Sequence, residues 1–233
     1  MGDLDPGAID HAFVLAAGRG ERMRPLTDRV PKPLAVVAGR TLLDRALDHL
    51  AAAGVRRAVV NAHHLADVLA AHLAARAEPP HITLSREDAL LDTGGGIARA
   101  RHHFAGRDFF VVAGDALWEG PALTDLAGAW DPARMDILIL LQPLRSMASG
   151  VGDYALLPDG RAVRSRSKTG THMFTSLRIN RAAIFAGAPA RPFSYLALLD
   201  QAEVAGRLYG LEHRGTWHHI STMVDIAAAE RAL

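Results

Sequence analysis

The sequence predicts an α/β fold in which a mostly parallel central sheet lies between layers of helices on both faces. Short apolar runs of strand length alternate with stretches of helical hydrophobic period along the first half of the chain. The connections between these segments are short, and parallel strands joined in this way need helical crossovers that cover the sheet. Glycine residues stand where several of the strands and helices are expected to end.

The N-terminal half of the chain, which we define as residues 10–118, carries the clearest alternation. Residues 12–17 (AFVLAA) are an apolar run that stops at Gly18, as a short buried strand does. Residues 41–53 place their leucines on one helical stripe and are followed by Gly54, a natural helix stop. The remaining elements predicted here are strands at 57–61, 81–85 and 108–113 and helices at 65–75 and 96–104.

The C-terminal half, residues 119–233, has a looser pattern. Residues 135–141 (MDILILL) predict a buried strand, and Pro158-Asp159-Gly160 marks the turn of a hairpin whose first arm is 154–157. The remaining elements predicted here are strands at 177–180 and 209–213 and helices at 193–206 and 223–233. Because no repeat or flexible linker separates the halves, we predict a single domain over residues 1–233, a Rossmann-like three-layer sandwich.

Composition narrows the class of protein. The chain has 233 residues with a net charge of +1, which gives no reason to expect a nucleic-acid partner. It contains no cysteine, which excludes disulfides and zinc–thiolate sites and fits a reducing cytoplasm. Residues 1–10 are acidic and lack the features of a signal peptide, and no apolar run approaches the ~20 residues of a membrane helix. We therefore expect a cytoplasmic protein with no membrane partner.

The most informative stretch is residues 15–34 (LAAGRGERMRPLTDRVPKPL), where a strand opens into a glycine- and arginine-rich loop. Gly18 and Gly20 permit close approach of the backbone, and their amides can face phosphate oxygens. Guanidinium groups such as that of Arg22 match phosphate oxygens, and the prolines on either side of Lys32 restrict the backbone that carries its ammonium. Taken alone, the loop fits a phosphate site and a solvent-exposed basic turn about equally well. It is neither a P-loop nor a dinucleotide fingerprint.

The same run resembles the signature of the sugar-1-phosphate nucleotidylyltransferases in its L-A-A-G-x-G-x-R-M-x-P and P-K-P-L segments. The resemblance continues through residues 92–96 (DTGGG), Asp115 and residues 206–229, so it covers essentially the whole chain. Within that family the chain is most similar to short bacterial uridylyltransferases that act on N-acetylmuramate 1-phosphate in peptidoglycan recycling. The resemblance implies an enzyme that transfers UMP from UTP to such a sugar 1-phosphate and releases pyrophosphate.

The resemblance also implies roles for individual residues. The nucleoside triphosphate would lie in the N-terminal half and the acceptor sugar in the C-terminal half. Arg22, Lys32 and Asp115 would be the catalytic residues, with Lys32 holding phosphate charge in the transition state. The residues expected to contact the nucleotide are Ala16, Ala17, Gly18, Gly20, Arg22, Gly94 and Gly95. For the glycines at 94 and 95, the sequence alone fits a helix start capped by Asp92 or Thr93 nearly as well.

A divalent metal, Mg²⁺ or else Mn²⁺, is the expected cofactor. Asp115 follows the apolar run 109–112 and would bind the metal at the carboxyl end of a central strand, although a lone aspartate there is more often a turn residue. The second metal ligand of many relatives is an aspartate, and here its position is His219. Three explanations stay open: Asp115, phosphates and water hold the metal, Mn²⁺ binds with His219 as ligand, or only binding of the nucleotide is retained. Asp225 is a possible substitute carboxylate.

Other assignments also stay open at this point. Asp153, in a Gly152-Asp153-Tyr154 element similar to one near the sugar in relatives, is either a sugar contact or part of an exposed turn. The His63-His64 and His102-His103 pairs are interpreted as surface residues rather than metal ligands. The alternative functions are guanylyl or cytidylyl transfer to mannose 1-phosphate or phosphocholine, and a catalytically weakened nucleotide-sugar-binding protein. The sequence does not predict the oligomeric state.

Overall fold

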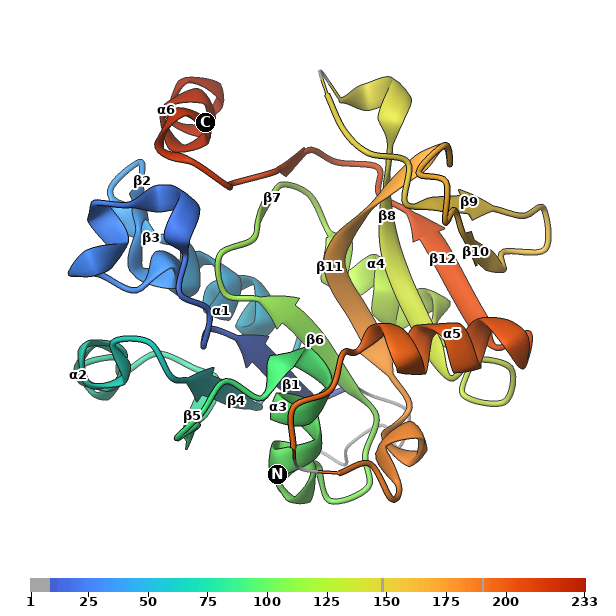
Figure 1. The fold of residues 1–233 in the computed structure, drawn as a ribbon, viewed down its shortest axis with the longest axis horizontal. Coiled ribbons are helices and arrows are strands. Elements are labelled where there is room, and N and C mark those ends of the chain that lie inside the picture. The colour runs from blue at the N-terminus through green and yellow to red at the C-terminus, as the bar shows by residue number, and fades with distance from the viewer. Residues whose placement is uncertain (1–8, 148, 190) are drawn as a thin grey trace.

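The computed structural model describes residues 9–147, 149–189 and 191–233 of the chain (Figure 1). The acidic segment 1–8, where a signal peptide would begin, lies outside the described residues. Among the helices that are described, none is long and apolar enough to cross a membrane.

A nine-stranded sheet runs through both halves of the molecule. Its path is β10-β9-β11-β6-β1-β4-β5, with β8 pairing to β11 and β12 pairing to β8. In the N-terminal half all neighbouring strands of this sheet are parallel, and Val14 lies opposite both Val60 and Val112. These parallel strands are β1 (His11–Leu15), β4 (Arg57–Ala62), β5 (His81–Arg86) and β6 (Phe109–Ala113).

The C-terminal half continues the sheet with mixed directions. Strand β11 (His172–Asn180) runs antiparallel to β6 and to β8 (Ile137–Pro143), and β12 (Leu208–Glu212) runs parallel to β8. A hairpin of β9 (Tyr154–Leu156) and β10 (Ala162–Arg164) surrounds the predicted turn. The predicted strand 177–180 covers only the second part of β11. The first part was not predicted, because an irregularity between Phe174 and Arg178 interrupts the apolar alternation.

Helices cover both faces of the sheet (Figure 1). Alternate strand residues point to opposite faces, so that Val14 joins one hydrophobic cluster and Phe13 the other. Helices α1 (Leu42–Ala52), α2 (Ala66–Ala74) and α4 (Ala122–Ala129) pack on the first face. Helices α3 (Asp92–Ala100) and α5 (Leu196–Val204) pack on the second. The predicted α/β sandwich with a mostly parallel sheet is therefore confirmed.

The closing helix α6 (Met223–Ala232) lies beside the loop that follows β1 rather than on the sheet (Figure 1). A third hydrophobic cluster joins the two, with Ile226 of α6 and Met23 of the loop both buried. The shorter elements are η1 (Glu21–Met23), η2 (Leu26–Asp28), η3 (Lys32–Leu34), β2 (Val36–Val37), β3 (Arg40–Thr41), η4 (Arg101–Phe104), β7 (Leu117–Trp118), η5 (Leu144–Ser146), η6 (Ala182–Phe185) and β13 (Trp217–His218).

The predicted start of a helix at residue 96 was wrong, because α3 begins at Asp92 and contains all three glycines. Each glycine is buried where a side chain would collide with a neighbour. A Cβ atom on Gly94 would lie 2.4 Å from the Phe193 ring, and one on Gly95 would lie 2.3 Å from the Arg191 carbonyl oxygen. Close packing, rather than a helix boundary, therefore explains the glycine cluster.

Candidate active site

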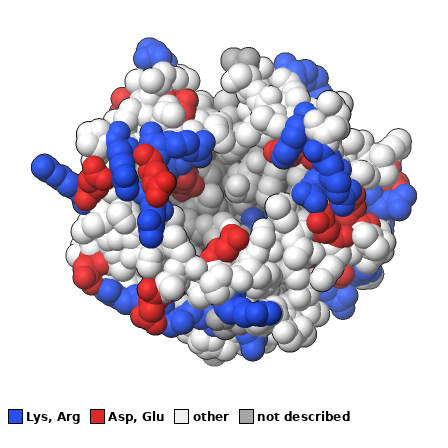
Figure 2. Space-filling view, viewed as in Figure 1, with Lys and Arg blue, Asp and Glu red and all other residues white. Residues whose placement is uncertain are grey.

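A cleft of about 570 Å³ opens at the carboxyl ends of β1, β4 and β6, which is the edge where open α/β sheets bind ligands. Figure 2 shows the molecule hollowed at its centre, with charged side chains on both rims. The lining residues come from the end of β1 and the loop after it, the ends of β4 and β6, the β5–α3 connection and the start of α3. They are Leu15, Ala16, Ala17, Gly18, Gly20, Arg22, Lys32, Pro33, Asn61, Glu87, Leu90, Asp92, Thr93, Ala113 and Asp115.

The loop after β1 is held in a compact shape by its own side chains. Gly20 has a φ of +62°, and a Cβ atom there would lie 2.9 Å from Thr27 Cγ2, so only glycine fits without strain. Thr27 in turn donates a hydrogen bond from Oγ1 to the Gly20 carbonyl at 2.9 Å. A Cβ atom on Gly18 would meet nothing within 4 Å. Packing therefore does not require glycine at 18, and its open backbone faces the cleft.

Lys32 and Asp115 meet at the cleft although they lie on different segments. Lys32 Nζ is 2.5 Å from Asp115 Oδ2 and donates a hydrogen bond to the Ile220 carbonyl at 2.6 Å. The Lys32 side chain is 12% exposed and that of Asp115 is 29% exposed. Such charge-assisted contacts at a partly buried site are stronger and shorter than neutral ones. The ammonium is thus held in one place before any nucleotide arrives.

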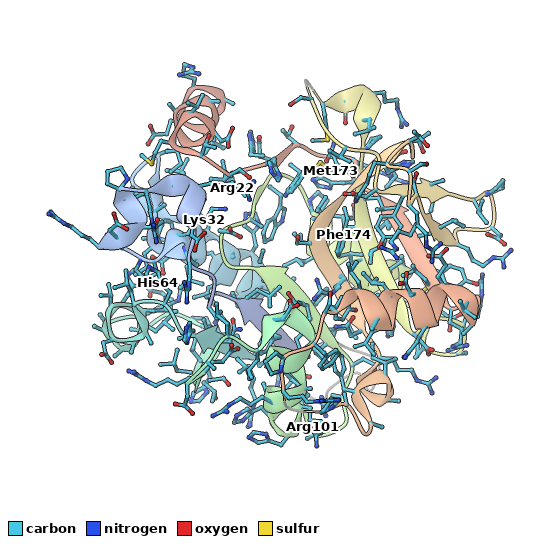
Figure 3. The ribbon with its side chains drawn as sticks, in the orientation of Figure 1. Arg22, Lys32, His64, Arg101, Met173 and Phe174 are labelled. Atoms are coloured by element: carbon cyan, nitrogen blue, oxygen red, sulfur yellow. The ribbon has the colours of Figure 1, made fainter. Side chains whose placement is uncertain are left out.

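Arg22 stands on the same side of the cleft as Lys32 (Figure 3). It is exposed, whereas the neighbouring Met23 is fully buried and anchors η1. A second cavity of about 390 Å³ adjoins the cleft and is lined by Arg19, Arg22, Lys32 and Ser221 among others. Cationic side chains therefore surround a continuous space that is suited to a polyanion.

Two buried polar residues at the cleft were missed by the sequence analysis. Asn61 is 3% exposed and Glu87 is 5% exposed, and both line the cavity. Asn61 Oδ1 accepts a hydrogen bond from the Ala16 amide at 2.7 Å, and its Nδ2 donates to Glu87 Oε1 at 2.7 Å. The available signal was that Asn61 is the last residue of the predicted strand 57–61 and that Glu87 comes shortly after the predicted strand 81–85, at the edge where ligands bind in open sheets.

Gly94 and Gly95, predicted to contact the nucleotide, are not among the residues that line the cleft, whereas Asp92 and Thr93 are. The capping alternative has a partial counterpart, because Asp92 Oδ1 accepts a hydrogen bond from the Thr93 amide at 2.6 Å. The residue before the helix, Leu91, makes no side-chain cap. Nucleotide contact by the two glycines stays a prediction, and their packing supplies an independent reason for glycine.

His219 lies on the segment after β13, near the Lys32–Asp115 pair. Its Nε2 is 2.7 Å from Ser221 Oγ, and its ring packs edge-on against Trp217. Burial lowers the pKa of His219, and the positive charge of Lys32 lowers that pKa further. The imidazole is therefore neutral near pH 7, which leaves one ring nitrogen able to accept a hydrogen bond or bind a metal.

The third carboxylate considered for a metal, Asp225, is engaged at the start of α6. Its Oδ2 accepts hydrogen bonds from the amides of Ser221 at 2.9 Å and Thr222 at 2.7 Å. In the part of the chain that the structure describes, no group of three or more ligating side chains comes together. Asp115 nevertheless fits Mg²⁺, because that ion is commonly held by one or two carboxylates with phosphate and water oxygens.

Asp153 lies in the C-terminal half, outside the cleft lining. Its Oδ1 is 2.6 Å from Lys168 Nζ, and its Oδ2 accepts a weak hydrogen bond from the Phe174 amide at 3.4 Å. Phe174 and Met173 lie on the part of β11 that borders the hollow (Figure 3). A contact between Asp153 and an acceptor sugar stays a prediction, which this neighbourhood permits.

The histidine pairs have structural partners. His64 Nε2 lies 2.7 Å from the Thr27 carbonyl of the loop, and His63 Nδ1 lies 2.9 Å from the Glu87 carbonyl. His102 is exposed on η4, and its ring centroid lies 3.9 Å from that of His103, with the two rings tilted by 41°. The first pair therefore contacts the backbone of two segments that border the cleft, the loop after β1 and the β5–α3 connection.

Comparison with known proteins adds information that geometry alone does not carry. Residues 12–181 match the model of the MobA-like NTP transferase domain. The chain is 38% identical to an N-acetylmuramate alpha-1-phosphate uridylyltransferase from Caulobacter vibrioides, over 95% of this chain and 96% of that protein. It is 34% identical to a protein of the same name from Neisseria meningitidis, over 94% and 96%. A solved UDP-glucose pyrophosphorylase in complex with UDP-glucose superposes with a TM-score of 0.79 at 14% identity, over 96% of this chain and 98% of that one.

Proposed function

The chain belongs to the MobA-like NTP transferase family and is a nucleotidyltransferase, and from that premise we propose that it transfers UMP from UTP to N-acetylmuramate 1-phosphate. The observation that carries the proposal is the Lys32–Asp115 pair, which stands at a glycine-bordered cleft beside Arg22. The base and the sugar are proposed from the two relatives that align with this chain over nearly their full length. We assign the nucleotide to the N-terminal half and the acceptor to the C-terminal half.

The chemistry matches what these residues can supply. A phosphate oxygen of the acceptor attacks the α-phosphorus of the nucleotide, a new P–O bond forms, and the bond to the β-phosphate breaks with its electron pair leaving on pyrophosphate. Because the attacking oxygen is already anionic, no general base is needed. The protein must align the two phosphates and neutralise their charge. Arg22 and Lys32 supply that charge, and the open backbone at Gly18 admits the nucleotide.

Lys32 is the best oriented of these cations. Asp115 and the Ile220 carbonyl hold its ammonium from two sides at the edge of the cleft. An ammonium placed in advance reorganises little as charge develops on the phosphates, which is the condition for strong electrostatic catalysis.

A divalent cation would be held by Asp115 together with phosphate and water oxygens. When bound, it would neutralise phosphate charge and so assist departure of pyrophosphate. The imidazole nitrogen of His219 would suit Mn²⁺ better than Mg²⁺. We therefore propose that Asp115 holds Mg²⁺ without His219, and the alternative is Mn²⁺ held by Asp115 and His219 together.

The finer aspects of the proposal follow from the substrates. UTP is a cytoplasmic metabolite, so we place the reaction in the cytoplasm. N-acetylmuramate is a peptidoglycan sugar, so we place the reaction in peptidoglycan recycling. His219 favours one second candidate, a catalytically weakened nucleotide-sugar-binding protein, because an imidazole stands at the position where the sequence resemblance leads us to expect a second carboxylate.

The test is pyrophosphate release from UTP, GTP, CTP, dTTP and ATP against N-acetylmuramate, N-acetylglucosamine, glucose and mannose 1-phosphates, with Mg²⁺ and again with Mn²⁺. We expect turnover with UTP and N-acetylmuramate 1-phosphate, and about 10³-fold less from the Lys32→Met variant. Turnover confined to another pair would replace the substrates and keep the reaction class. Tight nucleotide binding without turnover under either metal would establish the second candidate instead.

A further inference from the structure

The nucleotide end of the cleft is built around a hydrogen-bonded chain that runs through one side chain. Asn61, at the end of β4, accepts from the Ala16 amide of the loop after β1 and donates to Glu87, which follows β5. Glu87 Oε2 then accepts from the Leu91 amide, directly before α3, at 3.1 Å. Three segments that border the cleft are thus joined through Asn61.

We propose that Asn61 is a positioning residue for the nucleotide, which it orders indirectly by fixing the loop at Ala16 and the carboxylate of Glu87 together. This inference rests on the proposed nucleotide site but not on the identity of the base or the acceptor. Asn61 would not need to touch the reacting atoms. It would act through the shape of the walls that receive the nucleotide.

The orientation of the Asn61 amide follows from the chemistry of its partners. A backbone N–H can only donate, so the atom facing Ala16 must be the oxygen. A carboxylate can only accept, so the atom facing Glu87 must be the NH₂ group. No other neutral side chain of this size offers an acceptor on one side and a donor on the other, so leucine cannot replace it and aspartate can do so only when it is protonated.

The surroundings of Glu87 explain why loss of the Asn61 hydrogen bond would change the cleft. The Glu87 carboxylate is buried, and in the described ranges of the chain no side-chain nitrogen of a lysine, arginine or histidine lies within 4.0 Å of the carboxylate oxygens. Its negative charge is therefore stabilised by hydrogen bonds from Asn61 and Leu91 rather than by an ion pair. Removing the Asn61 donor would leave a buried acceptor short of a partner, and groups of that kind move toward water or toward new donors.

The packing around the pair allows little adjustment. A Cβ atom on Gly96 would lie 2.8 Å from Glu87 Oε1 and 3.1 Å from Asn61 Nδ2, so α3 approaches the pair as closely as a glycine permits. The backbone of Glu87 is held as well, because His63 Nδ1 lies 2.9 Å from its carbonyl oxygen. Glu87 therefore has no nearby alternative position that keeps both of its hydrogen bonds, and loss of Asn61 would be transmitted to the cleft wall.

The consequence for binding is specific to one substrate. Ala16 and Glu87 line the cleft of the N-terminal half, whereas Asp153 and Phe174 lie apart from that lining. Loss of the Asn61 hydrogen bonds should weaken nucleotide binding about tenfold to 100-fold, which is the range expected when a buried hydrogen-bonded group loses its partner. The KM for the acceptor should stay within about twofold, because its walls are not joined to this chain of hydrogen bonds.

The first experiment measures nucleotide binding without turnover. Isothermal titration of the wild type with UTP, GTP and CTP identifies the nucleotide that binds most tightly, and that nucleotide is then titrated into Asn61→Ser. The matched control is Asn180→Ser, because Asn180 is fully buried on β11 of the same sheet and hydrogen-bonds Tyr195 instead of the cleft. We expect a clear loss of affinity in Asn61→Ser and wild-type affinity in Asn180→Ser. Equal affinities in all three proteins, or equal losses in both variants, would overturn the proposal.

A second variant separates positioning from a general loss of stability. Asn61→Asp would place two carboxylates side by side, and such a pair takes up a proton more readily than a lone carboxylate does. The shared proton would restore a donor to Glu87, so the affinity of Asn61→Asp relative to the wild type should rise as pH falls from 8 to 5. A flat ratio with pH would overturn the proposal. A nucleotide other than UTP in these titrations would correct the proposed function and leave the role of Asn61 intact.

Discussion

Each half of the molecule contains a lysine–aspartate pair, and the two pairs have nearly the same contact distance but different surroundings. Lys32 Nζ lies 2.5 Å from Asp115 in the N-terminal half, and Lys168 Nζ lies 2.6 Å from Asp153 in the C-terminal half. The Lys32 side chain is 12% exposed and also donates to a backbone carbonyl, whereas that of Lys168 is 59% exposed. Contact distance alone therefore does not distinguish a preorganised cation from a solvated one, but burial does.

The buried arginines show the same contrast between the halves. Arg76 in the N-terminal half binds two carboxylates, Asp44 at 3.0 Å and Asp48 at 2.6 Å. Arg178 in the C-terminal half is 2% exposed and stacks at 3.9 Å on the Tyr195 ring. Among the described residues no carboxylate lies within 4.0 Å of Arg178, and burial lowers its pKa. The N-terminal half balances its buried cations with acids, and the C-terminal half balances this one with aromatic rings.

The largest expected effect tests the two lysine pairs against each other. Lys32→Met should lower kcat/KM about 10³-fold, because a phosphoryl-transfer site then lacks a placed cation. Asp115→Asn should abolish metal-dependent turnover. Lys168→Met, which removes the solvated counterpart, should change kcat/KM less than about threefold. Steady-state kinetics of the three variants measures this, and a comparable loss in Lys168→Met would show that the two halves do not differ in this way.

Stability measurements extend the comparison to the arginines. Arg76→Met should lower the free energy of unfolding by about 2 kcal/mol, because it leaves Asp44 and Asp48 without their shared cation, although Asp48 is partly solvated. Arg178→Met should change it by less than about 1 kcal/mol, since the lost stacking is offset by relief of a buried charge without an acidic partner. Urea unfolding of both variants provides the values. A larger loss in Arg178→Met would mean that aromatic stacking stabilises a buried cation as well as carboxylates do.

The parts of the site that were predictable are those encoded in contiguous sequence. Gly20 and Lys32 lie in one short motif, and Asp115 follows an apolar strand, so each could be placed at the cleft edge before any tertiary contact was known. Asn61 and Glu87 are separated by 26 positions and form their hydrogen bond only when β4 and β5 pair, so neither looks special along the chain. The pairing of β4 with β5 depends on the tertiary structure and cannot be seen in the residues next to either side chain.

The misassigned elements have the same origin. A run of three glycines normally weakens a helix, and it is tolerated in α3 because Phe193, Arg191 and the Asn61–Glu87 pair pack against it. The first half of β11 was missed because Thr175 and Ser176 are consecutive polar residues that interrupt the apolar alternation, and in the structure Ser176 lies within the irregularity at a φ of +70°. In both places packing from distant segments outweighs local preference.

The proposed metal site tests a further difference between the halves, since Asp115 belongs to the N-terminal half and His219 to the C-terminal half. His219→Asp should raise the activity supported by Mg²⁺ about tenfold relative to that supported by Mn²⁺, because it supplies a second oxygen ligand. The ratio of kcat/KM in the two metals is the measurement, and His218→Asp serves as the control because His218 pairs with Glu119 instead. An unchanged ratio in His219→Asp would place the C-terminal half outside the metal site.

The smallest expected effects come from the helix caps, where both halves use threonine. Thr41 Oγ1 accepts from the Asp44 amide at 3.0 Å at the start of α1, and Thr222 Oγ1 accepts from the Asp225 amide at 3.4 Å at the start of α6. Thr41→Ala should lower the free energy of unfolding by about 1 kcal/mol and Thr222→Ala by about half of that. The difference follows from the shorter bond at Thr41 and from the place of α1 on the central sheet, since α6 packs on a smaller cluster that includes Met23, Val37 and Leu117. Urea unfolding monitored by circular dichroism resolves both values. If Thr222→Ala were the more harmful change, the C-terminal segment that carries His219 and the Ile220 carbonyl would contribute more to global stability than the start of α1 does.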